Sequence, residues 1–433
     1  MGSSPRVNRR TALKAAAAGV LAGPPAVARP RDDKPKIALI GCGGMGTGDA
    51  MNARRFGTVV AVCDVDANQA AKAAKAIGGE PKVYGDFRKL LDAEKDVSVV
   101  ITATPDHWHT LVNLAALRRG KDVYSEKPLT LTIDEGKRLV AEVKKTGRVL
   151  QTGSQQRSDP TFRLACEAVR NGRLGKLTKV TSVLPAGSHG GPFKPSPVPA
   201  GLDWDFWQGQ APAREYVKER CHVNFRFWLE YSGGTLTDWG AHHNDIVLWG
   251  IGRDRSGPVS VVGKRLVDPV PGGYTTPAEY EIEYTYADGL THVCKSTTAS
   301  SIFGGGQKAK TRTESAHGVR FEGTDGWLFV TRGKIEASNP AILKDPFAAT
   351  DTRLYVSNDH MGNFFDCVKT RKPPICDAEI GHRSVSVCHL GGIALRLGRK
   401  LAWDPAKEEF VGDKEANAQV AREQRKPWTY DAV

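Results

Sequence analysis

The sequence predicts an α/β fold with two domains: a parallel sheet wound on both faces, then an α+β domain with a large, mainly antiparallel open sheet. Three observations lead to it. A glycine-rich turn joins a short β-branched segment to a helical one within residues 36–56. Strand-like and helical segments alternate as far as residue 152, which is typical of a parallel sheet. Beyond residue 179, short alternating segments are joined by turns such as Asp288-Gly289, which indicates antiparallel strands.

The first domain is expected at residues 34–152, with boundaries set by its apolar runs. Its expected strands are 36–40, 58–63, 97–102, 122–125 and 149–152. Its expected helices end near 56, 77, 93, 119 and 147. The last helix opens with a capping box, Thr132 and Glu135, and stops at Gly147.

The turn Gly41-Cys42-Gly43-Gly44-Met45-Gly46 lies between the first strand and the first helix, and Asp64 ends the second strand. Glycines here allow a tight turn and a close approach of a pyrophosphate, and the helix N-terminus offers N–H groups to phosphate. Asp64 is placed to accept from ribose hydroxyls, and its charge repels a 2′-phosphate. This context predicts NAD rather than NADP, bound by Gly41, Gly43, Gly44, Met45, Gly46 and Asp64.

Two loops follow the carboxyl ends of later strands, where parallel sheets bind their ligands. These loops, at 103–109 and 126–128, are therefore expected beside the cofactor. Their candidate residues are Thr104, Pro105, Asp106, His109, Glu126 and Lys127. His107 and His109 diverge on a helix because they are two residues apart, so no metal site is expected.

The second domain is expected at residues 153–355, with strands at 179–184, 259–266, 279–286, 291–296, 318–323 and 326–330. An aromatic insertion lies between them and contains Trp204, Trp207, Phe225, Phe227, Trp228 and Tyr231. Aromatic faces suit the C–H faces of a sugar, but each ring is equally suited to a buried core, so one or two are expected to touch substrate. The candidate substrate contacts are Gln155, Gln156, Arg157, Arg226, Trp228 and Asp245.

Three segments together resemble the Gfo/Idh/MocA oxidoreductase family. They are the glycine turn, Glu126-Lys127-Pro128, and residues 233–245, which contain Asp238 and His242. The resemblance implies that Lys127, Asp238 and His242 surround the substrate carbon facing the nicotinamide. It implies a homo-oligomer formed through the open sheet. It also implies that residues 356–433 form a closing helix and tail on the first domain. Asp106 stands where many members have Asn, and His109 is expected to brace its loop.

The three implied catalytic residues suit alcohol oxidation. A base must take the hydroxyl proton, and histidine has the appropriate pKa. On one helix, Asp238 and His242 share a face, so the carboxylate can orient the ring or contact the substrate. A lysine nearby stabilises the developing alkoxide. The alternatives are a core histidine for His242, a surface ion pair for Lys127 and helix packing for Asp245.

Residues 1–28 are expected to be an export peptide. Four basic residues and no acid precede a weakly apolar stretch, and Ala26-Val27-Ala28 is typical of a cleavage site. Arg9-Arg10 resembles a twin-arginine signal, which predicts a periplasmic or otherwise exported protein. The alternative is a frayed basic terminus. Since this route carries folded proteins, the eight cysteines need not be paired.

Composition excludes several other classes. The 433 residues are 40% hydrophobic and 25% charged, which excludes a disordered chain. There are 61 Lys and Arg against 48 Asp and Glu, but they are scattered, so no nucleic acid partner is expected. No apolar run reaches about 18 residues, so no membrane span is expected.

These features predict an NAD-dependent oxidoreductase that transfers a hydride to or from a hydroxyl or keto carbon of a sugar, glycoside or cyclitol. Because dinucleotides are scarce outside the cytoplasm, we expect the cofactor to stay bound and to be recycled internally. The alternative is an NAD-dependent glycoside hydrolase or lyase that works by transient oxidation. A non-catalytic sugar sensor is a remote alternative, because the export signal and Lys127, Asp238 and His242 argue against it.

Overall fold

A computed structural model describes residues 34–298 and 317–433 of the chain. The expected export peptide at 1–28 lies outside these residues. None of the helices within the two described ranges is both long enough and apolar enough to span a membrane.

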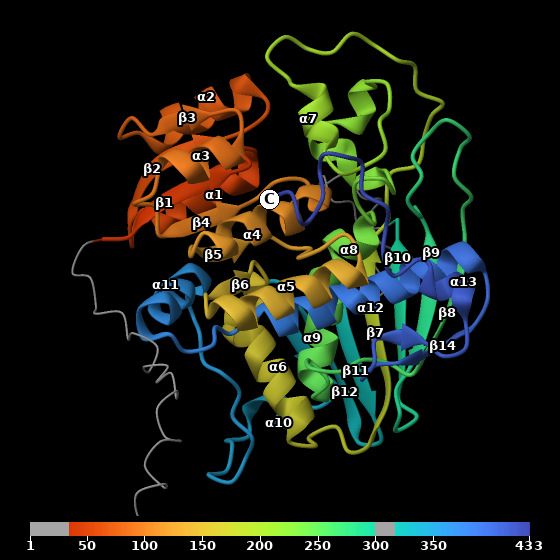
Figure 1. Cartoon of the computed structure of the whole chain (residues 1–433). Coiled ribbons are helices and arrows are strands. Elements are labelled where there is room, and N and C mark those ends of the chain that lie inside the picture. The colour runs from red at the N-terminus through yellow and green to blue at the C-terminus, as the bar shows by residue number, and fades with distance from the viewer. Residues whose placement is uncertain (1–33, 299–316) are drawn as a thin grey trace, which may run out of the picture. The chain divides into compact units, whose positions relative to one another are not determined.

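The first sheet consists of parallel strands in the order β3-β2-β1-β4-β5-β6 (Figure 1). The strands are β1 Lys36–Ile40, β2 Thr58–Cys63, β3 Lys82–Tyr84, β4 Val99–Thr102, β5 Asp122–Ser125 and β6 Leu150–Thr152. All residues of β4 are buried, as in sheets covered on both faces. The edge strand β3 was not predicted, because two of its three residues are exposed and it carries no apolar period.

The helices between these strands are α1 Gly44–Ala53, α2 Ala67–Ile77, α3 Phe87–Ala93, α4 Asp106–Arg118 and α5 Ile133–Thr146. The predicted cap of α5 forms, since the Thr132 hydroxyl accepts from the Glu135 N–H at 3.3 Å. Gly147 ends α5 with a φ of 62°. At α1, in contrast, Gly43 is the N-cap residue and no side chain caps the helix. The first N–H groups of α1 are thus available to a ligand.

The second sheet has the order β13-β12-β11-β7-β10-β9-β8-β14-β15. Its strands are β7 Leu177–Pro185, β8 Ser260–Arg265, β9 Tyr280–Thr285, β10 Thr291–Thr297, β11 Gly318–Gly323, β12 Gly326–Thr331, β13 Lys334–Ala337, β14 Leu401–Asp404 and β15 Glu409–Phe410. Neighbours are antiparallel except β7 and β10, which are parallel. The predicted mainly antiparallel sheet is therefore confirmed. The short strands β13, β14 and β15 were not predicted.

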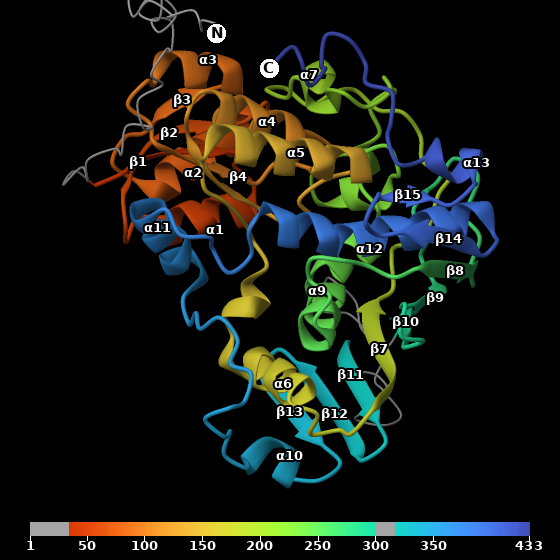
Figure 2. The same cartoon turned by 60° about the horizontal axis from the view of Figure 1, so that its bottom comes forward.

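The remaining helices are α6 Pro160–Arg170, α7 Trp204–Gln208, α8 Thr235–Asp238, α9 Gly240–Ile251, α10 Ala341–Lys344, α11 His360–Thr370, α12 Ala378–Leu397 and α13 Lys414–Asn417. Among them, α6, α9 and α12 pack on this sheet. Helix α12 lies beside α5 in both views (Figures 1 and 2) and also packs on α9 and β8. Helix α11 packs on α1, whereas β14 pairs with β8. The C-terminal segment therefore contributes to both domains.

Candidate active site

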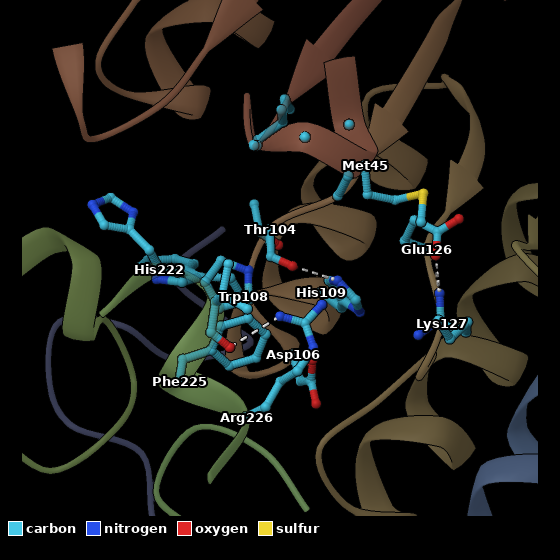
Figure 3. Close-up of a pocket in the computed structure, with 18 of the residues that line it drawn as sticks. Met45, Thr104, Asp106, Trp108, His109, Glu126, Lys127, His222, Phe225 and Arg226 are labelled. Carbon is cyan, nitrogen blue, oxygen red and sulfur yellow. Dashed lines mark hydrogen bonds between the residues drawn. The ribbon is translucent and has the colours of Figure 1, made fainter. Parts of the chain in front are cut away.

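A cavity of about 920 Å³ lies at the carboxyl ends of the first sheet, and residues of the second domain complete its wall. The first domain contributes the residues that follow β1, β2, β4 and β5. The segment after α7 and the α8–α9 region contribute the opposite side. Figure 3 shows His222, Phe225 and Arg226 along the second-domain segment. This is where sheets of this kind bind dinucleotides.

The glycine turn fits the pyrophosphate of such a ligand. At Gly41, φ is +95° and a Cβ would lie 2.5 Å from the Ala103 carbonyl, so only glycine is accommodated. A Cβ on Gly46 would lie 2.1 Å from the Gly41 carbonyl oxygen. A Cβ on Gly43 or Gly44 would meet nothing within 4 Å, so their backbones border open space. Met45 extends from this turn toward Glu126 (Figure 3).

Asp64 is held in place at the end of β2 by two backbone donors. Its carboxylate oxygens accept from the N–H groups of Cys42 at 2.8 Å and Asp66 at 2.9 Å. Burial raises the pKa of Asp64, while these hydrogen bonds favour its ionised form. His222, from the second domain, lines the cavity at this end and lies 3.4 Å from the Asp66 carboxylate. The end of the cavity that contains Asp64 is thus bordered by both domains.

His109 joins the two loops that were predicted beside the cofactor. Its Nδ1 lies 2.7 Å from the Pro128 carbonyl oxygen and its Nε2 lies 2.8 Å from that of Thr104. The ring therefore braces both loops. His107 points elsewhere, with Nε2 2.9 Å from the Trp207 carbonyl oxygen. Within residues 34–298 and 317–433, no cluster of side chains suitable for a metal is found.

Asp106 and Glu126 are buried carboxyl groups in the cavity wall. Asp106 accepts from the Ser232 hydroxyl at 2.5 Å, and burial raises its pKa to about 7. Glu126 accepts from the Gln155 side-chain amide at 2.8 Å, and burial raises its pKa as well. Burial therefore favours the protonated form of both carboxyl groups.

Lys127 and Asp238 meet across the cavity. The Lys127 ammonium donates to the Asp238 carboxylate at 2.5 Å and to its main-chain carbonyl at 3.2 Å. Arg226 Nε lies 3.4 Å from the same carboxylate. Burial opposes ionisation of Asp238, but these two cations outweigh it and hold its pKa at about 2. Asp238 is thus the counter-ion of Lys127.

The expected single helix through Asp238 and His242 is interrupted. Helix α8 ends at Asp238 and α9 begins at Gly240, and the His242 N–H donates to the Trp239 carbonyl at 3.0 Å. The Asp238 carbonyl is free to accept from Lys127 for this reason. Asp238 forms ion pairs with Lys127 and Arg226, and among the described contacts it has none with the His242 ring. Orientation of the ring by Asp238 is therefore not observed.

His242 lines the cavity and is 5% exposed. Its Nδ1 is buried and has no hydrogen-bond partner among the residues that the structure describes. Burial, followed by the positive charges of Lys127 and Arg332, lowers the pKa of His242 well below its ordinary value. The direction of this shift is away from the near-neutral pKa that was expected. The imidazole is neutral and can accept a proton, although it is a weaker base than an exposed histidine.

Three predicted substrate contacts are not in the cavity wall. Arg157 and Asp245 form a buried ion pair, with Nε and Nη2 each 2.8 Å from a carboxylate oxygen. The Asp245 carboxylate is thus engaged within the protein, which agrees with the alternative of a packing role. The Trp228 indole donates to the Glu219 carbonyl at 2.7 Å inside an aromatic cluster. All three side chains satisfy their polar groups within the protein, so they are unavailable to a ligand. Gln155 and Arg226 do line the cavity.

Comparison with known proteins shows that both domains match one protein family. Residues 35–154 match the NAD-binding Rossmann fold of an oxidoreductase family, and residues 187–430 match its C-terminal alpha/beta domain. The chain belongs to the Gfo/Idh/MocA oxidoreductase family. It is therefore an NAD-dependent oxidoreductase, as predicted.

Family members with assigned activities are similar over different lengths. The scyllo-inositol 2-dehydrogenase (NAD(+)) of Bacillus subtilis is 26% identical over 78% of this chain and 88% of its own length. The myo-inositol 2-dehydrogenase of Thermotoga maritima is 32% identical over 35% of this chain and 46% of its own length. The WlbA dehydrogenase of Bordetella pertussis, solved with NADH and UDP-GlcNAcA, has a TM-score of 0.63 at 18% identity, covering 86% of this chain and 99% of that one.

Several cavity residues of this family member were not predicted. Arg332 follows β12, Trp239 lies between α8 and α9, and His222 precedes the aromatic residues of the insertion. Trp239 lies inside the 233–245 segment, so its position next to Asp238 could have indicated that it lines the site. Arg332 stands in an ordinary turn, Thr331-Arg332-Gly333, whose local sequence gives none. Only the pairing of β12 with β11 and β13 brings it to the site.

Proposed function

We propose that the protein oxidises a hydroxyl carbon of a sugar, glycoside or cyclitol, or reduces the corresponding ketone. The observation that carries the proposal is that Lys127, Asp238 and His242 all lie in the wall of the dinucleotide cavity, with Lys127 bound to Asp238. The glycine turn and α1 would hold the pyrophosphate, and Asp64 the ribose. When bound, NAD supplies the hydride acceptor for the substrate C–H bond.

The side chains then manage the proton and the charge on oxygen. The neutral His242 imidazole takes the hydroxyl proton as the carbonyl double bond forms. Lys127, held in place by its Asp238 partner, stabilises the negative charge that develops on the oxygen. In the reverse direction the imidazolium returns the proton. The neighbouring aromatic rings Trp207 and Phe225 offer apolar faces to the sugar ring.

The test is a single-turnover measurement on the protein loaded with NAD. A panel of sugars, glycosides and cyclitols is added, and reduced nicotinamide is followed by its near-ultraviolet absorbance. Absorbance change with at least one compound supports the proposal. Free sugar released from an aryl glycoside without added NAD would instead favour hydrolysis through transient oxidation. Absence of both reactions across the panel would contradict the proposal.

We also propose export by the twin-arginine route with the cofactor retained and recycled. The support is the Arg9-Arg10 motif and the placement of His222 and Val223, residues of the second domain, on the cavity wall beside Asp64. Replacing both arginines by lysine should leave precursor in the cytoplasm. Denaturing the purified mature protein should release NAD.

We further propose a homo-oligomer formed through the second sheet, where alternate β9 residues such as Glu281 and Glu283 are exposed.

A further inference from the structure

Arg332 stands in the wall of the cavity with a charge that no described carboxylate neutralises through an ion pair. It follows β12 in the turn to β13. Its guanidinium lies over the Trp239 ring, 4.9 Å from the centroid. This contact orients the guanidinium plane without cancelling its charge. Lys127 and Arg226, in contrast, share the Asp238 carboxylate.

The acids around Arg332 are engaged elsewhere. Asp238, Glu126 and Asp159 are close enough to influence it. Asp238 binds the two other cations, and Glu126 accepts from Gln155 and from the Lys127 N–H. Asp159 caps α6, accepting from the Thr161 N–H at 2.7 Å. The nearby histidines, His242, His243 and His317, are all held toward the neutral form, with burial as the main cause. The Arg332 guanidinium therefore faces the cavity without an ion-pair partner among the residues that the structure describes.

Gln156 gives a second, independent indication of a ligand. It lines the same cavity and is only 3% exposed. Both its amide nitrogen and its amide oxygen are buried, and neither has a hydrogen-bond partner within the described ranges. Leaving a buried amide unsatisfied is costly, so such a group in a native site indicates a missing partner.

We propose that Arg332 and Gln156 bind an acidic group, a carboxylate or a phosphate, carried by the sugar or cyclitol substrate. The guanidinium fork matches two oxygens of either group, and the Gln156 amide can donate to a third position or accept a neighbouring hydroxyl. Lys127 and His242 remain with the carbon that is oxidised. The inference names the substrate class of the proposed oxidoreductase site and rests on that function.

The experiment compares matched ligands on the NAD-loaded protein. Methyl glucoside is paired with methyl glucuronide, and glucose with glucose 6-phosphate, and binding is measured by calorimetry. We expect the acidic member of one pair to bind about 10- to 100-fold more tightly, as charged hydrogen bonds of this kind contribute. Arg332→Gln should remove this preference and Gln156→Leu should reduce it. Whichever pair shows the preference identifies carboxylate or phosphate.

Arg320→Gln is the matched control. Arg320 also lies over a tryptophan ring, 4.1 Å from the centroid of Trp327, but it pairs with Glu322 and is not in the cavity wall. It should leave the preference unchanged. Equal binding within both pairs, or a preference that survives Arg332→Gln, overturns the inference. Acid-dependent binding without any NAD reduction supports the anion site and counts against the proposed oxidation of these sugars. NAD reduction by neutral sugars, with no preference for the acidic member of either pair, supports the sugar oxidation and overturns the anion site.

Discussion

Two buried ion pairs lie one after the other along the α8–α9 region, and they differ in what surrounds them. Arg157 and Asp245 are 1% and 0% exposed, and the Ser384 hydroxyl adds a further hydrogen bond to the carboxylate. Lys127 and Asp238 are 9% and 11% exposed and border a large cavity. The residue types are alike, so type alone does not identify a catalytic pair. Access to the cavity does.

The largest effect should come from removing the base of the open site. His242→Ala should lower the rate of hydride transfer by about 10²–10⁴, the usual contribution of a positioned acid–base group. Bound NAD should stay at full occupancy, because His242 does not contact the glycine turn. Single-turnover absorbance and dinucleotide content measure the two quantities. Near-normal transfer in a fully loaded variant would leave His242 structural and move the base to Asp238 or Asp106.

A change in the fully buried pair, Arg157 and Asp245, should instead lower the stability of the fold. Asp245→Asn leaves the Arg157 charge buried without its main partner, and the free energy of unfolding should fall by about 3–5 kcal/mol. Denaturant titration measures the loss. Asp254→Asn is the control, because Asp254 is 23% exposed and lies 3.3 Å from Arg157, so it should cost much less. Comparable losses in both variants would show that Asp245 is not the dominant partner.

Asp64 is an intermediate case, held by backbone donors yet facing the cavity. Asp64→Ser should weaken NAD binding and narrow the difference from NADP by about 1–3 kcal/mol, the scale of a lost charged hydrogen bond. Fluorescence titration with both cofactors provides the measurement. Equal affinities in the unmodified protein would indicate that Asp64 does not select between them.

Removing the counter-ion of the open pair should change the rate moderately. Asp238→Asn should slow hydride transfer by about 10-fold, because the Lys127 ammonium loses the charged partner that holds it at the cavity wall. Unfolding free energy should change less than in Asp245→Asn, since the pair borders the cavity. An unchanged rate of hydride transfer, measured by single-turnover absorbance, would show that the ion pair does not position Lys127 for the chemistry.

A further effect, on stability and not on rate, concerns Asp106, whose pKa is raised to about 7 by burial. The folded state holds this proton more tightly than the unfolded state, so its contribution to stability is present at low pH. That contribution should decrease as pH rises from about 4 to 7. Asp106→Asn should flatten this part of the profile. Denaturation at several pH values tests it, and an identical slope in both proteins would place the titration on another group.

The first domain could be predicted from sequence because its signals are local. Period, caps and glycines are encoded within each strand or helix, as for Thr132, Gly147 and the turn at Gly41. The strands β13, β14 and β15 escaped because two to four residues carry no period. They form where longer neighbours offer unpaired edges, which depends on the assembled sheet.

Site residues could be predicted where they belong to a short sequence motif whose position in the fold is known. Lys127 and His242 are in recognised segments and do line the cavity. Arg157 and Asp245 appeared equally polar and equally close to the motifs, but tertiary packing paired them with each other. Arg332 was missed for the opposite reason, since only strand pairing brings it to the cavity. Pairing across the fold is the information that local sequence lacks.

The interruption of the helix at Trp239 determines how many N–H groups of the Lys127 ammonium remain for a substrate. A lysine ammonium has three N–H groups. Two of them are directed to Asp238, one to its carboxylate and one to the main-chain carbonyl that the interruption exposes. Because the second acceptor is a main-chain carbonyl, a change of the side chain at position 238 does not remove it. A single N–H is left for the substrate, which suits one alkoxide oxygen rather than the paired oxygens of an acid.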